Sequence, residues 1–355
     1  MTKKFNNITK NKSFNRSNNK RINKTLITVF DDFNQQLPPC PKCGSSTNVI
    51  KSGIRKLRQE SIQIYFCKLC KMRFSDRKLT HTTYPPKLIL HSLTYFNLGH
   101  TLDQTRKTMR RQFKTNIPIS TLNSWVHRYQ DDLPFIKLRK RFQIDPNDII
   151  HSKKFYHQQV YKFKYHTLKT NIAGKIFPQL KFYITSIVRT PNFIPSNVFM
   201  QGPRCSELKI DLKPQKTTKH NIATKLAELA LTLAKTNRER HEKVENFMLI
   251  NDNDTIAIEV PVYIHPNELN KQEQSIYGLK LTEPLSGHID VLQVRWNKTH
   301  ILDYKSDAKR SDKAAAEQLF LYSLALSKRI NTPISKINSA YFDDNKYFQI
   351  QPSNL

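Results

Sequence analysis

Two acidic residues and a lysine near the carboxyl end of the sequence have the types and spacing of a metal-dependent hydrolytic site. They are Asp290, Asp303 and Lys305. Carboxylate oxygens bind hard divalent cations, and Mg²⁺ usually takes one or two carboxylates together with water and phosphate oxygens. A nearby lysine can orient the attacking water or help to deprotonate it. The structural alternative is an ion pair between Asp303 and Lys305, without catalysis.

A β-hairpin is the element that must position these three side chains. The runs 288–294 and 300–305 are rich in Ile, Val and Leu and flank a polar turn. With Asn297 and Lys298 as the turn residues, Asp290 lies opposite Lys305, and Asp303 lies two positions away along the same strand. Because side chains alternate along a strand, this register predicts that all three share one face of the sheet.

The surrounding motifs resemble a known family. They are Glu259 on a predicted strand 255–263, Gly287-His288-Ile289-Asp290, Asp303-Tyr304-Lys305, and Gln318-Leu319-Phe320-Leu321-Tyr322 on a predicted helix 313–329. Together they are similar to the PD-(D/E)xK nucleases, specifically the RecB-type clade that includes CRISPR-associated exonucleases. The resemblance covers residues 220–350. It implies an α/β restriction-endonuclease-like domain at 216–355 with a mixed central sheet.

The resemblance also implies roles for individual residues. It makes Asp290 and Asp303 the principal ligands of a catalytic Mg²⁺ or Mn²⁺, His241 an additional ligand, Lys305 the catalytic lysine, Glu259 an auxiliary acid, and Gln318 and Tyr322 residues that shape the site. His241 and Tyr322 are alternatively ordinary packing residues, and Glu259 alternatively points to solvent. The sequence departs from the family name because Ile289 replaces its proline. An iron–sulfur cluster is not expected, since Cys205 is the sole cysteine near this domain.

Four cysteines near the amino terminus form two CxxC pairs, Cys40/Cys43 and Cys67/Cys70. Four thiolates complete a closed tetrahedral zinc site, so the predicted zinc is structural. The predicted strands 48–51 and 61–66 between the pairs give a zinc ribbon over residues 37–80. Disulfides are the alternative, but a Lys- and Asn-rich chain without a secretory signal favours a reduced, intracellular protein.

The residues after the ribbon have helical periodicity. Predicted helices at 88–96, 102–113 and 121–129, the last two beginning after Thr101 and Ser120, suit a helix-turn-helix unit at 84–134. This front end resembles the DNA-binding part of insertion-sequence transposases and their companion proteins. The predicted nucleic-acid-binding residues are Arg73, Asn123, Ser124, His127 and Arg128. A small helical bundle with solvated basic residues is the alternative interpretation.

The charge distribution supports nucleic acid as the partner. Residues 1–215 contain 40 Lys and Arg against 11 Asp and Glu, whereas residues 216–355 contain 19 against 17. A positive field of this kind attracts phosphates. Residues 1–36 are predicted to be a disordered basic arm. Residues 135–215 are predicted to be a largely helical spacer, with 160–187 mostly helical.

These observations predict a multidomain protein that acts as a metal-dependent DNA nuclease, directed to DNA by its amino-terminal half. We expect a cytoplasmic, DNA-associated protein with no membrane span and no small-molecule substrate. One alternative is a non-catalytic DNA-binding regulator derived from a mobile element. Another is a transposase, but the three separated carboxylates that it needs are not evident among the scarce acids of residues 135–215.

Overall fold

The computed structural model describes residues 37–56, 61–75, 79, 83–208, 216–277, 279, 281–306, 308 and 312–350. The predicted basic arm at 1–36 lies outside these residues. The chain divides into two compact units, residues 1–83 and 84–355. Among the described residues, no helix is both long and apolar enough to cross a membrane.

The described part of the first unit is a three-stranded antiparallel sheet with two cysteine-bearing turns. Its strands are β1 (Val49–Lys56), β2 (Ser61–Cys67) and β3 (Arg73–Ser75), in that order across the sheet. Strands β1 and β2 correspond to the two predicted strands. The buried residues Cys40, Val49 and Cys67 form a small core, to which the cysteine turns contribute.

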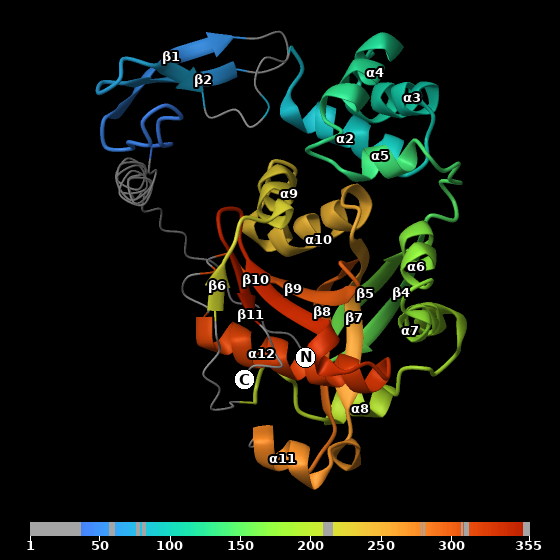
Figure 1. The fold of residues 1–355 in the computed structure, drawn as a ribbon. Coiled ribbons are helices and arrows are strands. Elements are labelled where there is room, and N and C mark those ends of the chain that lie inside the picture. Colours follow the sequence, from blue (N-terminus) through green and yellow to red (C-terminus); the bar gives the residue numbers. More distant parts are fainter. Residues whose placement is uncertain are drawn as a thin grey trace, which may run out of the picture. The chain divides into compact units, whose positions relative to one another are not determined.

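The second unit is built on one eight-stranded mixed sheet, in which only the β9–β10 pair is parallel (Figure 1). The strand order is β4-β5-β7-β8-β9-β10-β11-β6. The strands are β4 (Ile150–His157), β5 (Gln159–His166), β6 (Lys216–Thr218), β7 (Thr255–Ile264), β8 (Leu285–Arg295), β9 (Lys298–Tyr304), β10 (Ile337–Phe342) and β11 (Tyr347–Ile350).

Helices cover both faces of this sheet. Helices α9 (Ile222–Leu231) and α10 (Arg240–Asn251) lie on one side, and α12 (Asp312–Arg329) lies on the other (Figure 1). The remaining helices of this region are α6 (Thr167–Ala173), α7 (Pro178–Arg189), α8 (Ser196–Gln201) and α11 (Lys271–Tyr277). One large apolar cluster joins the sheet to α6, α7, α8 and α12.

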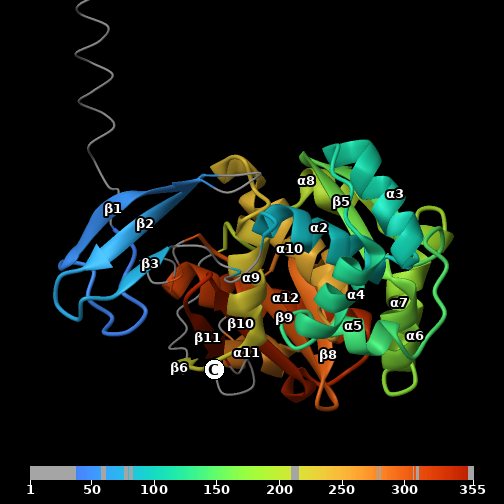
Figure 2. The same cartoon turned by 90° about the horizontal axis from the view of Figure 1, so that it is seen from above.

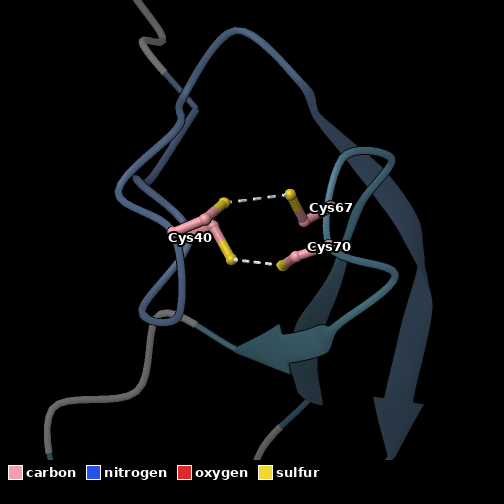
Figure 3. A group of neighbouring side chains, drawn as sticks. Cys40, Cys67 and Cys70 are labelled. Atoms are coloured by element: carbon pink, nitrogen blue, oxygen red, sulfur yellow. Dashed lines mark hydrogen bonds between the residues drawn. The ribbon is translucent and has the colours of Figure 1, made fainter.

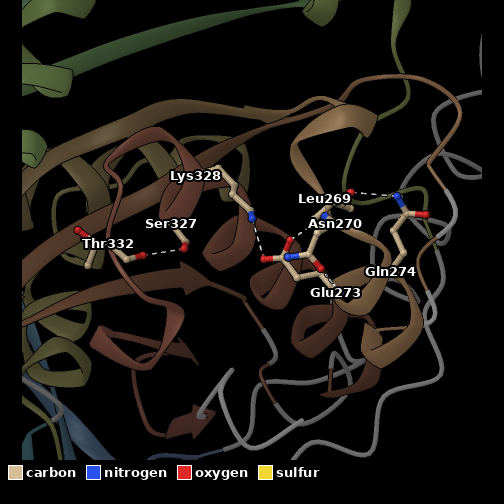
Figure 4. Close-up of polar contacts among 7 residues, drawn as sticks. All are labelled: Leu269, Asn270, Glu273, Gln274, Ser327, Lys328 and Thr332. Carbon is tan, nitrogen blue, oxygen red and sulfur yellow. Dashed lines mark hydrogen bonds and ion pairs between the residues drawn. The ribbon is translucent and has the colours of Figure 1, made fainter.

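Helix α11 is attached to the end of α12 by polar contacts. Asn270 and Glu273 cap the start of α11 reciprocally, with Glu273 N donating to Asn270 Oδ1 at 2.7 Å (Figure 4). The same Glu273 carboxylate lies 2.6 Å from Lys328 Nζ of α12. The cap satisfies backbone donors that the helix itself leaves unpaired, and the ion pair joins the two elements.

Residues 135–215 differ from the predicted helical spacer. Residues 150–157 and 159–166 are the strands β4 and β5, and β5 pairs with β7 in the central sheet. The prediction of helix is therefore wrong for residues 160–166, whereas 167–173 and 178–189 are helical as expected. The pair β4–β5 extends the sheet from one edge.

Four further helices precede the sheet in the second unit (Figure 2). They are α2 (Pro86–Asn97), α3 (Leu102–Phe113), α4 (Ile119–Arg128) and α5 (Phe135–Arg139). Thr101 caps α3 through a reciprocal box with Gln104, as its type predicts. The predicted cap at Ser120 is wrong, because α4 begins at Ile119 after Pro118.

The helices α2 and α5 pack against α10 of the covered sheet. At this contact the buried Asn97 of α2 donates from Nδ2 to Asn251 Oδ1 of α10 at 2.9 Å, and Asn251 donates to Thr94 Oγ1 at 3.3 Å. Buried amides are costly unless they are hydrogen-bonded, so this pairing favours one docking arrangement. The residues predicted as a helix-turn-helix thus pack against helix α10, which lies on the sheet.

Candidate active site

Three acidic residues stand in a row on the neighbouring strands β7, β8 and β9. The residues that flank Glu259 pair with those that flank Asp290, so these two side chains start opposite each other. Continuing the β8–β9 register places Asp290 opposite Asp303. Asp290 Oδ2 accepts from the backbone N–H of Tyr304 at 3.3 Å, next to Asp303 on β9.

The hairpin register differs from the prediction by two residues. Trp296 and Asn297 form the turn, with φ of 52° at both positions, and Arg295 pairs with Lys298. A two-residue turn with positive φ at both positions matches the twist of the strands. Asp290 therefore lies opposite Asp303 and not opposite Lys305. Because the shift is two residues, the alternation of side chains is unchanged and the two acids still share a face.

Helix α10 brings two further groups to Asp290. The ligand atoms of His241, Glu245 and Asp290 all lie within 4.8 Å of one another, and His241 Nδ1 is 3.9 Å from Asp290 Oδ2. Glu245 was not among the residues predicted from the sequence. Its signal was present, because it lies four residues after His241, hence on the same side of the helix, and interrupts the apolar stripe of Val244 and Phe247.

Lys305 connects the acidic row to α12. Its Nζ lies 2.7 Å from Asp303 Oδ2 and 3.5 Å from Gln318 Oε1. Gln318 in turn donates from Nε2 to the Tyr322 hydroxyl at 2.7 Å. The structure thus brings Lys305, Gln318 and Tyr322 together in one chain of contacts. Gln318 and Tyr322 are four residues apart, so one face of α12 supplies both.

The acids have raised pKa values, chiefly because burial disfavours their charged forms. The pKa of Glu259 rises to about 7. The pKa of Asp290 rises through burial and the neighbouring Glu259. The pKa of Asp303 lies well above its usual value through burial and Asp290, and that of Glu245 does so through burial, Glu259 and Asp290. Like charges this close cannot all ionise without a compensating cation.

The two basic groups of the site respond to the same surroundings in opposite ways. Burial lowers the pKa of His241, so the imidazole is neutral and able to bind a metal. Burial also acts to lower the pKa of Lys305, but the carboxylates of Asp303 and Asp290 outweigh it and the net pKa is raised. Lys305 therefore remains an ammonium group.

Glu259 has an unusual backbone conformation, with φ of 51° in the middle of β7. This left-handed region is strained for a residue with a side chain, and such strain is concentrated at functional positions. The side chain is half-buried and adjoins Arg204 and Lys164, whose charges act against the rise in its pKa. The side chain of Glu259 is thus partly shielded from solvent.

The residues present fit a divalent cation. His241, Glu245 and Asp290 offer one nitrogen and two carboxylates at mutual distances that a single ion can span, and these oxygen ligands suit a hard cation such as Mg²⁺. Asp303 stands beside this group of three, on the strand next to Asp290, and its carboxylate also pairs with Lys305. When the acids of this row ionise, their carboxylates repel one another. A bound cation would offset this repulsion, which gives a physical reason for binding one here.

A second group of potential metal ligands lies in the amino-terminal unit, where four thiols converge (Figure 3). Cys40 Sγ lies 3.4 Å from Cys70 Sγ, and Cys43 Sγ lies 3.6 Å from Cys67 Sγ. All five described cysteines are free thiols. A tetrahedral zinc site with Zn–S bonds of about 2.3 Å separates its sulfurs by roughly 3.8 Å, so this cluster fits zinc and the disulfide alternative does not apply.

The predicted nucleic-acid-binding residues are exposed. Arg73 lies on β3, and Asn123, Ser124, His127 and Arg128 lie on α4, whose opposite side buries Leu122, Trp125 and Val126. The neighbouring helix α3 presents Lys107, Arg110 and Arg111 around one shallow hollow, which Lys114 just after the helix also lines. The exposed side of α3 and α4 is thus rich in cationic and amide groups.

Comparison with known proteins agrees with this geometry. Residues 201–352 match the family model of the PD-(D/E)XK nuclease superfamily, so the carboxyl-terminal part of the chain contains a domain of this superfamily. The match begins at residue 201, ahead of the predicted boundary at 216. No curated protein matches the sequence.

Proposed function

We propose that this protein is a metal-dependent deoxyribonuclease that hydrolyses phosphodiester bonds, with a nuclease domain of the RecB-type clade. The observation that carries the proposal is the convergence of His241, Glu245 and Asp290 beside the Asp303–Lys305 pair. A site of this kind offers a place for a cation and a fixed ammonium group next to it. The superfamily match is consistent with nuclease chemistry.

His241, Glu245 and Asp290 would hold Mg²⁺ or Mn²⁺, with Asp303 as a further ligand. Such an ion polarises a phosphodiester and lowers the pKa of a water molecule. Lys305, held by Asp303 and Gln318, stabilises negative charge that develops on the phosphate oxygens. Tyr322 fixes Gln318 and so positions Lys305.

Burial raises the pKa of Glu259 to about 7, near neutrality. A general base is most effective when its pKa lies close to the working pH. We therefore assign to a carboxylate oxygen of Glu259 the role of accepting the proton from the attacking water. Lys305 does not take this role, because its raised pKa keeps it protonated.

The amino-terminal half is proposed to bring DNA to this site. The exposed side of α4 would enter a major groove through Asn123, Ser124, His127 and Arg128. Structural zinc would hold the two cysteine turns together and so support the neighbouring strand β3. Arg73 on β3 would contact the DNA backbone. The concentration of positive charge before residue 216 supports this division of labour.

A cleavage assay with a matched variant tests the proposal. Labelled single-stranded, duplex and branched DNA is incubated with Mg²⁺ or with EDTA. Asp303→Ala should lower the rate by on the order of 10²-fold or more, since it removes an acid of the site. Asp344→Ala is the control, because Asp344-Asn345-Lys346 has the same D-x-K spacing in the turn between β10 and β11.

The outcomes separate this proposal from its rival. Full activity in Asp303→Ala would exclude the site, and cleavage that persists in EDTA would exclude the metal. Specific DNA binding by the wild-type protein without hydrolysis of any substrate would favour the non-catalytic regulator.

A further inference from the structure

A loop outside the predicted site residues is fastened to the strand that carries Asp290. Ser286 of β8 donates its N–H to Pro203 O at 3.1 Å, and its carbonyl accepts from Cys205 N at 2.8 Å. Arg204 lies between these two bonds and forms a parallel bridge with Ser286. The backbone of Arg204 is therefore fixed beside Ser286 of β8, and Ser286 lies four residues before Asp290.

The guanidinium group of Arg204 is held by an aromatic side chain from β5. It donates from Nη2 to the Tyr161 hydroxyl, and its Cζ lies 5.7 Å from the centre of the Tyr161 ring. Tyr161 stacks on His288, with ring centres 3.7 Å apart and planes 10° apart. His288 is two residues before Asp290 on β8, so this stack ends next to the acidic row.

His288 is itself fixed from the opposite side. His157 Nδ1 of β4 lies 3.1 Å from His288 Nε2, and the ring of His157 stacks on Phe199 of α8 at 4.1 Å. Both histidines are buried. These stacked and hydrogen-bonded rings hold Tyr161 in place, because each ring contacts the next. Such packing leaves few alternative side-chain rotamers.

The positive charge of Arg204 adjoins the Glu259 end of the acidic row. Its interaction with Glu259 is favourable and acts to lower the pKa of that carboxyl group. Lys305 pairs with Asp303, at the other end of the row. Neighbouring strands lie about 4.8 Å apart, so Glu259 on β7 and Asp303 on β9 start roughly 10 Å apart. Arg204 therefore acts at the Glu259 end of the row, and Lys305 acts at the Asp303 end.

We propose that Arg204 binds the phosphate next to the scissile phosphate in the substrate strand, with Tyr161 and His288 positioning its guanidinium group. This inference rests on the proposed nuclease function. A guanidinium group has five donors in a planar fork that matches phosphate oxygens, and the bond to Tyr161 uses one of them. A strand that crosses the row from Lys305 toward Glu259 would place its next phosphate at Arg204.

Neutral phosphate analogues provide the test. A set of labelled oligonucleotides of one sequence carries a single methylphosphonate at successive positions, and product lengths give the rate at each bond with Mg²⁺. In the wild-type protein, neutralising the phosphate adjacent to the cleaved bond should lower kcat/KM by about 10- to 100-fold, as expected for one charge-assisted contact. Arg204→Ala should lower kcat/KM on unmodified DNA by a similar factor.

The decisive result is non-additivity of these two changes. In Arg204→Ala, the methylphosphonate at the adjacent position should cause little further loss, while the effects at other positions remain as in the wild type. Arg204→Lys should show an intermediate loss, since it keeps the charge but not the fork. Tyr161→Phe should raise KM and reduce the sensitivity to the adjacent methylphosphonate, because it frees the guanidinium group.

Arg329→Lys is the matched control. Arg329 lies over the ring of Tyr263 with its Cζ 4.1 Å from the ring centre and pairs with Glu268. It is eleven residues beyond Gln318 on α12, or about 16 Å along the helix. This variant also replaces arginine by lysine where an arginine stacks on a tyrosine. It should leave the effect of each methylphosphonate position on kcat/KM unchanged. Thermal unfolding of each variant identifies losses that come from misfolding.

The possible failures are distinguishable. If the wild-type protein cleaves DNA but the effects of Arg204→Ala and the adjacent methylphosphonate multiply, Arg204 acts only as a counter-charge to Glu259 and the inference is wrong. The same conclusion follows if Arg204→Lys, correctly folded, matches the wild type at every position. If the wild-type protein cleaves no substrate with Mg²⁺, the proposed function fails, and the role of Arg204 fails with it.

Discussion

The acids of the candidate site share buried surroundings, in which a proton and a bound cation would compete for the same oxygens. Glu259, with its pKa raised to about 7, and Asp290, Asp303 and Glu245, with pKa values raised by burial, bind protons more tightly in the folded state than in the unfolded state. The stability that these protons contribute is complete below the unfolded pKa values. It is lost as the pH rises through the folded values.

Metal binding should reverse this loss at higher pH. We predict that Mg²⁺ raises the free energy of unfolding more at pH 8 than at pH 6, because its ligands must be deprotonated. At about 100 times the dissociation constant, the gain is about 2.7 kcal/mol. Urea unfolding with and without Mg²⁺ measures it. Asp290→Asn should abolish the gain, and the control Asp344→Asn should keep it. An equal or larger gain at pH 6 would contradict the assignment.

At the level of single residues, the sequence predicted the acidic pair and its lysine but not every neighbour. Asp290, Asp303 and Lys305 could be recognised because a hairpin carries side chains at fixed alternation, which a register error of two leaves unchanged. Glu245 and Arg204 could not be placed in the same way. Their contacts with the site depend on how α10 and the loop before β6 dock on the sheet, which local pattern does not encode.

At the level of elements, Gly287 permits α12 to approach β8. A Cβ at this position would lie 2.2 Å from Cε1 of Tyr322, whose ring is buried and cannot swing aside. The glycine before His288 is thus explained by packing: the ring of Tyr322 occupies the space of a side chain. The position of Gln318 on the same helix face depends on this close contact.

We predict that Gly287→Ala destabilises the protein by about 1–3 kcal/mol, the usual cost of overpacking, and lowers the cleavage rate by displacing Tyr322 and Gln318. Urea unfolding and the cleavage assay measure the two effects. A change of less than about 0.5 kcal/mol in Gly287→Ala would show that this packing argument is wrong.

The elements differed in how well the sequence predicted them. Helices α3 and α12 and strands β7 and β8 were predicted within a few residues, because their periodicity and their caps are local signals. Strand β5 was misread as helix. Its aromatic residues Tyr161, Phe163 and Tyr165 alternate with polar ones, which is the period of a strand, and two of them are buried in the sheet core.

At the level of the whole molecule, the helices predicted as a separate DNA-binding unit pack against helix α10 of the sheet-containing unit. The buried Asn97–Asn251 bond joins α2 to the helix that carries His241 and Glu245. Composition and charge indicated two functional halves that meet near residue 216. The two compact units of the structure instead meet after residue 83. This contact depends on residues 154 positions apart, so no local pattern could have predicted it.

The central claim is that α10 and β8 hold a divalent cation between them, and anomalous diffraction from crystals grown with Mn²⁺ tests it most directly. The account predicts an anomalous peak about 2.1 Å from a carboxylate oxygen of Asp290, within reach of Glu245 and His241, and no such peak in crystals of Asp290→Asn. Fully ordered side chains at His241, Glu245 and Asp290 with no Mn²⁺ among them, or Mn²⁺ bound only elsewhere on the chain, would contradict it.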